Sequence, residues 1–447
     1  MTPELRPLAQ DEEVLANMII AADTLHGGNV KIADAGARLI ADQYPLDSVA
    51  LPPAYHDDRA EKLREAGGAK PDLAEDVRGY IGDYELLNAR AQLAEAFADA
   101  SPQRKAFADN LGGAVEEMVK LALAQAQGDK LPDFSTRWEA AIKQAPQLAD
   151  TAELQEALRA ALASAGVEVG GGTLREALDI WDHRVGVIDR DSFTTEFATE
   201  YDGFLAQARR RLFAEAGLDV DDIPFDGLNL STFHKPESHT SGSNLYIGGP
   251  AMKTHLQLNT GHPATRMGLK NLVAHEGMPG HYADSVLADL MWRKGKIGFE
   301  AMVSTMCTPD VVLREGWAQN ALPALFSGPR EALDALGPDF AVELAVEALI
   351  DAAKNDGVIL MQRDGMDREA LAKHLKAHHV LSDMFVLKIL GWASHDLIGS
   401  MYGGAYRRGN LSVARAIEEH GVAKVAEHCF HQHGYHDIAT FEAALAA

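Results

Sequence analysis

Cysteine is scarce in this sequence: 447 residues include only Cys307 and Cys429. Two thiols cannot form a disulfide framework, and without other ligands they cannot hold a structural zinc ion. No run of about 18 apolar residues occurs, so no membrane-spanning helix is expected. The first residues lack the basic segment and apolar run of a secretory signal. These absences predict an unexported protein of the reducing cytoplasm.

Basic residues are also few, with 41 Lys and Arg against 66 Asp and Glu, which gives a formal net charge of -25. Such a field repels phosphate backbones and anionic lipid surfaces, so we expect neither a nucleic-acid partner nor a membrane partner. Aromatic residues make up only 7%, yet hydrophobic residues reach 47%, enough for a sizeable core and too many for a disordered chain. A homo-oligomer is compatible with this composition.

Helical spacing of apolar residues dominates the chain and predicts a mainly α fold. Residues 1–225 are expected to form a helical lobe, in which Ser101, Thr136 and Thr173 are the predicted N-caps of three helices. Residues 226–447 are expected to form the catalytic region. Within it, residues 244–247 and 255–259 alternate as strands do, and Gly248-Gly249-Pro250 separates them, which predicts a small β element.

One stretch carries a chemical signal: His275-Glu276 is followed by His281. Two histidines four apart on a helix meet one metal ion, but histidines six apart lie roughly 240° apart around a regular helix. Pro279 removes a backbone donor, and the flanking Gly277 and Gly280 tolerate unusual dihedrals. The sequence therefore predicts a helix that is distorted between the two histidines, so that both imidazoles reach one ion.

In that geometry Glu276 would lie beside the metal and take a proton from water without binding the metal. A third ligand is expected from Glu315, in the segment Glu315-Gly316-Trp317, because an anionic ligand offsets the charge of the ion and leaves a fourth position open. Asp284 and Asp289 compete for this role, and Asp284 is one helical turn from His281, where it would orient the imidazole instead. The prediction is one Zn²⁺ per chain.

These residues resemble a widespread bacterial family of zincin-like proteins, catalogued as domain of unknown function 885, which carries His-Glu-x-x-Pro-Gly-His and a downstream Glu-Gly-Trp-Ala. Residues 275–281 and 315–318 match both motifs, and the likeness extends through residues 241–247, 263–274 and, weakly, 434–445. The resemblance implies a large helical zincin-like (gluzincin) fold with a small sheet beside the active-site helix, the ligands His275, His281 and Glu315, and Glu276 as the base.

The sequence departs from the family at two places. Tyr282 stands where the family has a second histidine, and the segment Leu387 to Gly391 only loosely matches a family segment that carries a tyrosine. We therefore expect Tyr402 or Tyr406, in a glycine-broken segment rich in donors, to stabilise the oxyanion, although an ordinary turn fits this segment equally well.

Other candidates are weaker. The histidines near the C-terminus could form a second metal site, but a helix end with capping and solvated histidines is the favoured interpretation. They are His428, His431, His433 and His436. The loop 234–239 precedes the first predicted strand and could contact substrate, or be a solvated loop.

The sequence thus predicts an enzyme, a cytoplasmic zinc-dependent metallopeptidase that hydrolyses short peptides. One alternative is a metallohydrolase of non-peptide amides or esters. Another is a non-catalytic helical binding protein that keeps the same scaffold.

Overall fold

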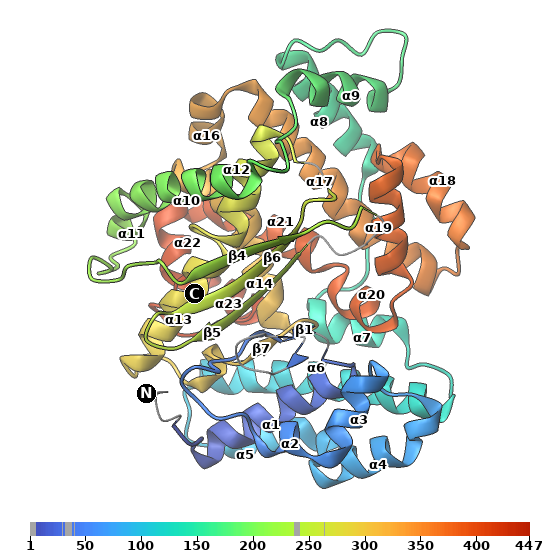
Figure 1. The fold of residues 1–447 in the computed structure, drawn as a ribbon, viewed down its shortest axis with the longest axis vertical. Helices are drawn as coiled ribbons and strands as arrows, with labels where there is room; N and C mark the ends of the chain where they lie inside the picture. Colours follow the sequence, from blue (N-terminus) through green and yellow to red (C-terminus); the bar gives the residue numbers. More distant parts are fainter. Residues whose placement is uncertain (1–5, 29, 32–37, 40, 237–241, 263) are drawn as a thin grey trace.

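The computed structural model describes residues 6–28, 30–31, 38–39, 41–236, 242–262 and 264–447. The predicted residues 237–239 of the loop, Ser241 and Pro263 lie outside these ranges. Helices dominate, with one small five-stranded sheet, so the predicted mainly α fold with a small β element is confirmed (Figure 1). Among the described residues, every helix is too short or too polar to span a bilayer.

The first half of the chain is helical, as predicted, and its first six helices lie together at the bottom of Figure 1. Ser101 caps the long helix α6 and Thr173 caps α9 in a capping box with Glu176, both as predicted. The prediction for Thr136 is wrong, because Asp133 lies three residues earlier and accepts the Thr136 amide itself. The helices are α1 (Gln10–Leu25), α2 (Pro53–His56), α3 (Asp58–Ala66), α4 (Ala74–Asp83), α5 (Ala89–Ala96), α6 (Pro102–Gln127), α7 (Phe134–Ile142), α8 (Thr151–Ser164), α9 (Leu174–Val185), α10 (Phe193–Arg210) and α11 (Leu212–Glu215).

The sheet has the strand order β4-β6-β5-β3-β7. The two predicted strands are β5 and β6, which pair antiparallel, and β4 runs parallel to β6 at the edge. The sequence analysis missed β3, which comes from the N-terminal half and pairs parallel to β5 through Gln43 and Tyr246. The five strands are β3 (Ala41–Gln43), β4 (Leu228–Phe233), β5 (Gly242–Gly248), β6 (Lys253–Asn259) and β7 (Ser304–Thr305), and a separate pair joins β1 (Val30–Lys31) to β2 (Arg38–Leu39).

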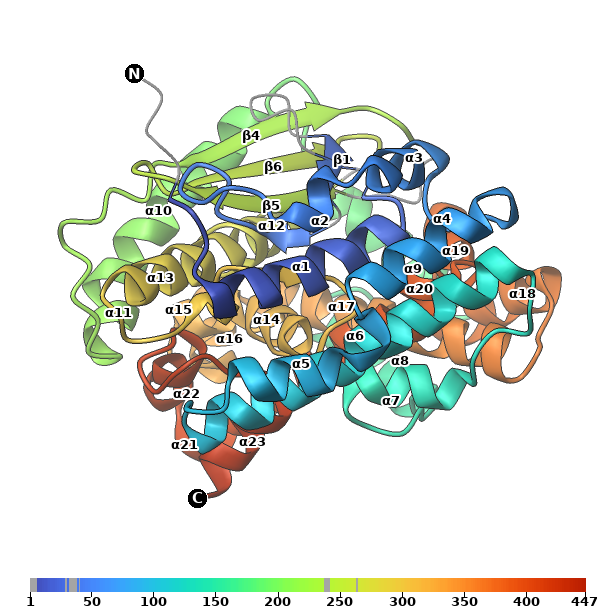
Figure 2. The same cartoon turned by 90° about the horizontal axis from the view of Figure 1, so that it is seen from below.

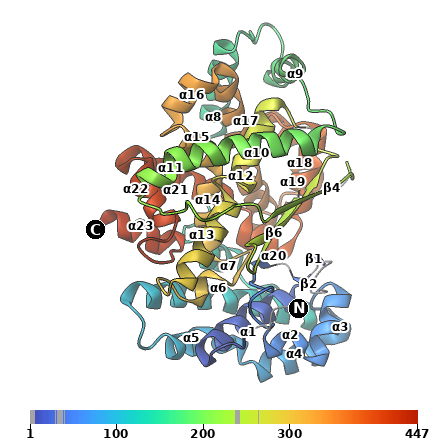
Figure 3. The same cartoon turned by 60° about the vertical axis from the view of Figure 1, so that its left-hand side comes forward.

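Helices of the second half cover one face of this sheet, and Figure 2 shows α12 and α13 beneath β5 and β6. Side chains of β5 reach both helices, since Asn244 contacts Glu276 and Tyr246 donates to Asp289 at 2.7 Å. Figure 3 shows the same layering from the side, with β4 on the outer edge. The sheet thus supports the two helices that carry the histidine motif.

The remaining helices enclose this layer. They are α12 (Arg266–Glu276), α13 (His281–Arg293), α14 (Pro309–Gln319), α15 (Ala321–Leu325), α16 (Pro329–Leu336), α17 (Pro338–Val358), α18 (Arg368–His379), α19 (Asp383–Ala393), α20 (Asp396–Tyr402), α21 (Ala405–His420), α22 (Val422–Cys429) and α23 (Ile438–Ala446). One buried core runs through both halves of the chain, and a smaller cluster joins α8 and α9 to α17. The boundary expected near residue 225 stays a prediction, although β3 crosses it to join the sheet.

Candidate metal centre

The helix that carries the motif stops between the two histidines. α12 ends at Glu276, where the carbonyl of Val273 accepts from both the Gly277 and the Met278 amides, at 3.0 and 3.2 Å. A new helix, α13, begins at His281. The imidazoles of His275 and His281 consequently lie side by side, with ring centroids 4.7 Å apart and ring planes at 89°. The interruption predicted from the sequence is therefore present, and it brings the two histidines together.

Gly280 makes this close turn sterically possible. A Cβ atom at this position would lie 1.9 Å from the carbonyl oxygen of His275 and 2.5 Å from that of Ala274. Both distances are far inside van der Waals contact, so a side chain would force α13 away from the end of α12. The Gly280 amide instead donates to the Ala274 carbonyl at 2.8 Å. The glycine thus fixes the distance between the two histidines.

Glu315 comes from α14, which packs closely against α21. At the crossing, a Cβ on Gly316 would lie 2.4 Å from the carbonyl oxygen of Gly409. On the next position the buried indole of Trp317 donates to the carbonyl of Pro279 at 2.8 Å. The helix that bears Glu315 is therefore attached directly to the turn between the two histidines.

The three predicted ligands converge on one point. Oε2 of Glu315 lies 3.5 Å from Nε2 of His275 and 3.7 Å from Nε2 of His281. This oxygen is buried and has no hydrogen-bond partner among the described residues. The three ligand atoms lie within 4.8 Å of one another. Ligands of a tetrahedral zinc lie about 3.3 Å apart, given bonds of about 2.0 Å, so the set fits such an ion with a small contraction.

Hydrogen bonds fix the tautomer of His275. Its Nδ1 lies 3.0 Å from Oε1 of Gln319, and the amide nitrogen of Gln319 donates to both oxygens of Asp351 at 2.8 and 3.0 Å. Because Asp351 holds the amide nitrogen, the amide oxygen faces His275, and Nδ1 must be the donor. Nε2 of a neutral His275 then carries the lone pair that a metal needs.

Glu276 lies beside the three ligands and is held by a separate network. The amide of Asn244 donates to Oε2 of Glu276 at 3.1 Å, and Oγ1 of Thr254 donates to Oδ1 of Asn244 at 2.6 Å. Because the backbone carbonyl and Oε2 of Glu276 are both acceptors, they fix the nitrogen end of the Asn244 amide toward Glu276. Side chains of the sheet therefore orient the Glu276 carboxylate.

The two predicted tyrosines lie next to the ligands but differ in what they contact. The buried Tyr402 hydroxyl donates to Oε1 of Glu315, and the two tyrosine hydroxyls are 3.1 Å apart. The single proton of Tyr402 is committed to Glu315, so Tyr406 is the donor between the two hydroxyls. The Tyr406 ring is nearly parallel to that of His275, with centroids 6.4 Å apart and an angle of 7°.

The electrostatics of the cluster favour a positive charge. Burial alone would lower the pKa of His275, but the carboxylates of Glu315 and Glu276 outweigh it and raise that pKa to about 9. Burial alone would raise the pKa of Glu315, but His281 and His275 hold it well below its usual range. Burial also raises the pKa values of Tyr402 and Tyr406, so both stay protonated donors. A metal cation would take the place of the proton that His275 holds.

The competing carboxylates are not part of this cluster. Asp284 accepts from Nε of Arg314 at 2.8 Å and lies 2.7 Å from Nε2 of His431, so the prediction that it orients His281 is wrong. Asp289 binds Arg293 and Tyr246. Asp284 lies only three positions after His281 on α13, so it is its stronger partners, Arg314 and His431, that hold its carboxylate away from the cluster.

The C-terminal histidines contact separate partners. His431 faces Asp284, His433 faces Glu427 at 2.9 Å, and His428 lies 3.4 Å from His436. Among the residues described, only His275, His281 and Glu315 form a group with metal-ligand spacing. The expectation of solvated histidines holds only for His433, because the side chains of His428, His431 and His436 are buried.

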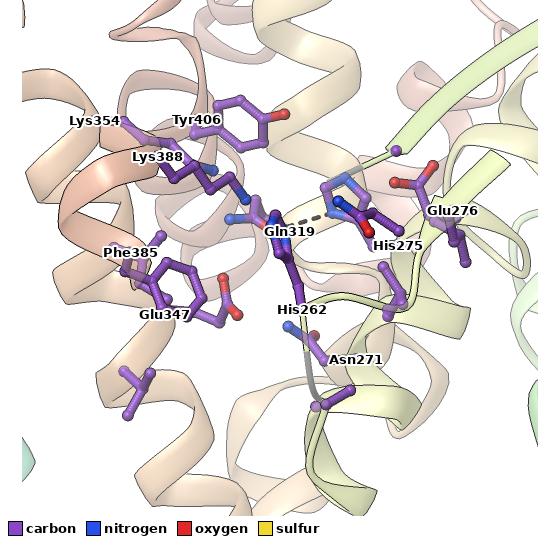
Figure 4. Close-up of a pocket in the computed structure, with 18 of the residues that line it drawn as sticks. His262, Asn271, His275, Glu276, Gln319, Glu347, Lys354, Phe385, Lys388 and Tyr406 are labelled. Carbon is purple, nitrogen blue, oxygen red and sulfur yellow. Dashed lines mark hydrogen bonds between the residues drawn. The ribbon is translucent and has the colours of Figure 1, made fainter. Parts of the chain in front are cut away.

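A cavity of about 760 Å³ opens onto the metal cluster. Figure 4 shows His275 between Glu276 on one side and Tyr406 on the other, with Lys354, Lys388 and Glu347 farther along the wall. Helices α9, α17 and α19 supply much of the remaining wall. The cluster therefore lies at the end of a space that a small organic molecule can enter.

The sequence analysis overlooked several residues of this site. Gln319 follows Glu315 by four residues, so helical spacing alone places both on one face of α14, and this signal could have identified it. Asn244 lies in a predicted strand, but its contact with Glu276 depends on how the sheet meets α12. Asp351 and Lys354 belong to α17 and carry no motif. Asp42 lies on a strand that the sequence did not predict.

Comparisons with known proteins identify the fold only. No family model matches this sequence, and no curated protein does. The solved structures that match it include a candidate lipoprotein from Colwellia psychrerythraea and a candidate lipoprotein of unknown function from Shewanella oneidensis. Each aligns with a TM-score of 0.52 and 13% identity over 87% of this chain, which spans 72% and 76% of their respective lengths.

These findings contradict the family assignment made from the sequence. The absence of any matching family model removes the support for the zincin-like family and its gluzincin fold. The descriptions of the two structures that share the fold name neither zinc nor a hydrolase. The short motifs matched locally, whereas a family assignment requires agreement along the chain. The candidate site therefore rests on its own geometry.

Proposed function

We propose that this protein is a zinc-dependent hydrolase that cleaves short peptides, with one zinc ion per chain. The observation that carries the proposal is the convergence of two imidazole nitrogens on a buried carboxylate oxygen of Glu315 that has no hydrogen-bond partner among the described residues. Two neutral imidazoles and one carboxylate leave a coordination position open, which distinguishes catalytic from structural zinc sites.

Bound zinc would supply Lewis acidity and make a water molecule more acidic. The chain supplies the proton transfers. Glu276 is close to the cluster but outside the ligand set, and Asn244 holds its carboxylate in place. In the proposed reaction Glu276 takes a proton from the attacking water and passes it to the departing amine.

Tyr406 is proposed to stabilise the oxyanion of the tetrahedral intermediate. Its hydroxyl donates to Tyr402 when no substrate is present, and this neutral hydrogen bond can be exchanged for a stronger one to an anionic oxygen. Tyr402 cannot make the same exchange without abandoning Glu315. The proposal therefore assigns ligand support to Tyr402 and oxyanion stabilisation to Tyr406.

The size of the cavity supports a small substrate. A volume of about 760 Å³ falls within the range of roughly 300 to 1,000 Å³ that is typical of small-molecule sites. A short peptide fits such a space, whereas a folded protein does not. Non-peptide amides and esters remain the alternative substrates. The location in the cytoplasm belongs to the same proposal, and the two free, buried cysteines are compatible with it.

The first test measures bound zinc in protein purified without chelators, together with digestion of a peptide library. We expect close to one zinc per chain, and loss of most of it in His275→Ala and His281→Ala. His420→Ala is the control, since His420 is exposed on α21 and should leave the zinc content unchanged. Glu276→Gln should keep its zinc and lose at least ~100-fold in hydrolysis.

Two outcomes would refute the proposal. Protein that stays metal-free in added zinc would remove the metal site. Zinc-loaded protein that hydrolyses no peptide, amide or ester would point instead to the non-catalytic binding protein considered from the sequence.

A further inference from the structure

Asp42 is a carboxylate in the cavity that the proposed reaction does not use. It lies on β3, and it lines the same cavity as Glu276 and Glu315. Within the described part of the chain, neither a hydrogen bond nor an ion pair is formed by its side chain. Burial raises the pKa of Asp42 to about 8, although Arg314 opposes this shift. Asp42 is half-buried, and a carboxylate that is partly removed from water without a partner is destabilised, which a bound cation would relieve.

Among the described residues, the nearby Arg314 does not provide this cation. Its Nε donates to Asp284 at 2.8 Å and its Nη2 donates to Ser285 at 2.9 Å. Its Nη1 is buried and has no acceptor among the described residues, and the side chain is only 7% exposed. Arg314 also lines the cavity. In the part of the chain that the structure describes, a donor of Arg314 and the Asp42 carboxylate thus both line one cavity without a partner, and no ion pair joins them.

The other charged side chains of the cavity are also more often acidic than basic. Besides Asp42 and Arg314, six carboxylic acids and three Lys or Arg side chains line its wall in the described residues, and one of the six, Glu343, has a pKa raised to about 8. Arg175 is bound to Asp179 and Asp182, and Lys354 lies 3.5 Å from Asp351. The cavity therefore favours a cationic group over an anionic one.

We propose that Asp42 binds the free α-ammonium group of the substrate, so that the enzyme selects peptides with an unblocked amino terminus. This inference rests on the proposed function and narrows its substrate class. An amino-terminal residue carries an ammonium group and, one carbon away, a carbonyl. The ammonium donates to the Asp42 carboxylate, and the carbonyl accepts from Nη1 of Arg314. Both unpaired groups are then satisfied by one residue.

The kinetic test compares each cleaved peptide with its N-acetylated form. For the unmodified protein, acetylation should lower kcat/KM by at least ~30-fold, because the acetylated nitrogen carries no charge and cannot form the ion pair with Asp42. Asp42→Asn should reduce this preference to about 3-fold or less, chiefly by lowering kcat/KM for the peptide with the free amino terminus. Asp179→Asn is the matched control: this carboxylate lies on the same cavity wall, on α9, and its removal should leave the preference unchanged.

A binding measurement separates failure of this inference from failure of the proposed function. Calorimetry on zinc-loaded Glu276→Gln should show the same preference for the free amino terminus without any turnover, and its loss when Asp42→Asn is added. Equal binding and equal cleavage of both forms would overturn the role of Asp42 while leaving the hydrolase proposal intact.

Discussion

At the scale of single residues, the direction of each hydrogen bond separates groups that the sequence could not rank. Tyr402 and Tyr406 are four residues apart, and both hydroxyls lie near Glu315. Only the hydrogen-bond count distinguishes them, because Tyr402 has one proton and donates it to Glu315. The pair therefore allows a matched experiment in which each substitution removes a single hydroxyl.

Tyr406→Phe is expected to lower kcat by at least ~100-fold, because it removes the proposed oxyanion donor, with zinc content unchanged. Tyr402→Phe is expected to weaken zinc binding by about 10 to 100-fold, because Glu315 loses the group that orients it. Zinc titration and steady-state kinetics on both variants check this. Equal losses of kcat with full zinc in both variants would contradict the division of roles.

The sequence indicates the residues that form the cluster but not those that orient them. His275, Glu276, His281 and Glu315 are found through a spacing and a charge argument, and the structure brings all four together. Asn244 and Asp42 belong to strands whose approach to the helices depends on the tertiary fold. No local sequence pattern indicates how these strands approach the helices. Two short motifs, in turn, did not suffice to assign the chain to a family.

At the scale of elements, the position of Glu315 depends on the contact between α14 and α21. Gly316 and Gly409 lie at the crossing of these helices, where their backbones are in direct contact. Any side chain at Gly316 would separate the helices and move the preceding residue, Glu315. The stability of this crossing and the geometry of the metal cluster are therefore coupled.

Gly316→Ala is expected to lower the free energy of unfolding by about 1 to 3 kcal/mol, because the added methyl group overpacks the crossing. Zinc affinity should fall in the same variant. Gly203→Ala is the control, since Gly203 lies inside α10 and a Cβ there meets no atom within 4 Å. That substitution should instead raise stability by about 0.5 to 1 kcal/mol. Urea denaturation measures both, and equal stability of Gly316→Ala and the unmodified protein would contradict the close crossing.

Whether a helix or strand can be predicted from the sequence depends on how far apart along the chain the interacting residues lie. The break between α12 and α13 is encoded by adjacent Gly and Pro residues, and β5 and β6 form a local hairpin-like pair, so both were predicted. β3 has only three residues, and its partners are about 200 and 260 positions away in the chain. Its pairing comes from the whole fold, and no periodicity in three residues could reveal it.

At the scale of the whole molecule, acidic charge is both abundant and partly buried. The net charge is -25, and several carboxylates line the cavity beside the metal cluster. Glu343 on α17 is only 6% exposed. Its burial, and to a smaller extent the charge of the neighbouring Glu347, raise its pKa to about 8. Such a group makes the stability of the fold depend on pH.

The sign of this dependence follows from proton binding. Because the folded pKa of Glu343, about 8, exceeds the ordinary value of 4.5, the folded chain holds the proton more tightly than the unfolded chain does. The resulting stability is complete below about pH 4.5 and is lost as the pH rises toward 8.

One pKa unit corresponds to about 1.4 kcal/mol. Glu343→Gln removes the charge at every pH, so this variant should match the unmodified protein near pH 4.5 and be more stable by at least ~2 kcal/mol at pH 8. Glu65→Gln, an exposed change of the same kind on α3, should show no such growing difference. Urea denaturation from pH 4.5 to 8 measures all three proteins. A constant difference between Glu343→Gln and the unmodified protein over this range would show that Glu343 does not keep its proton in the folded state.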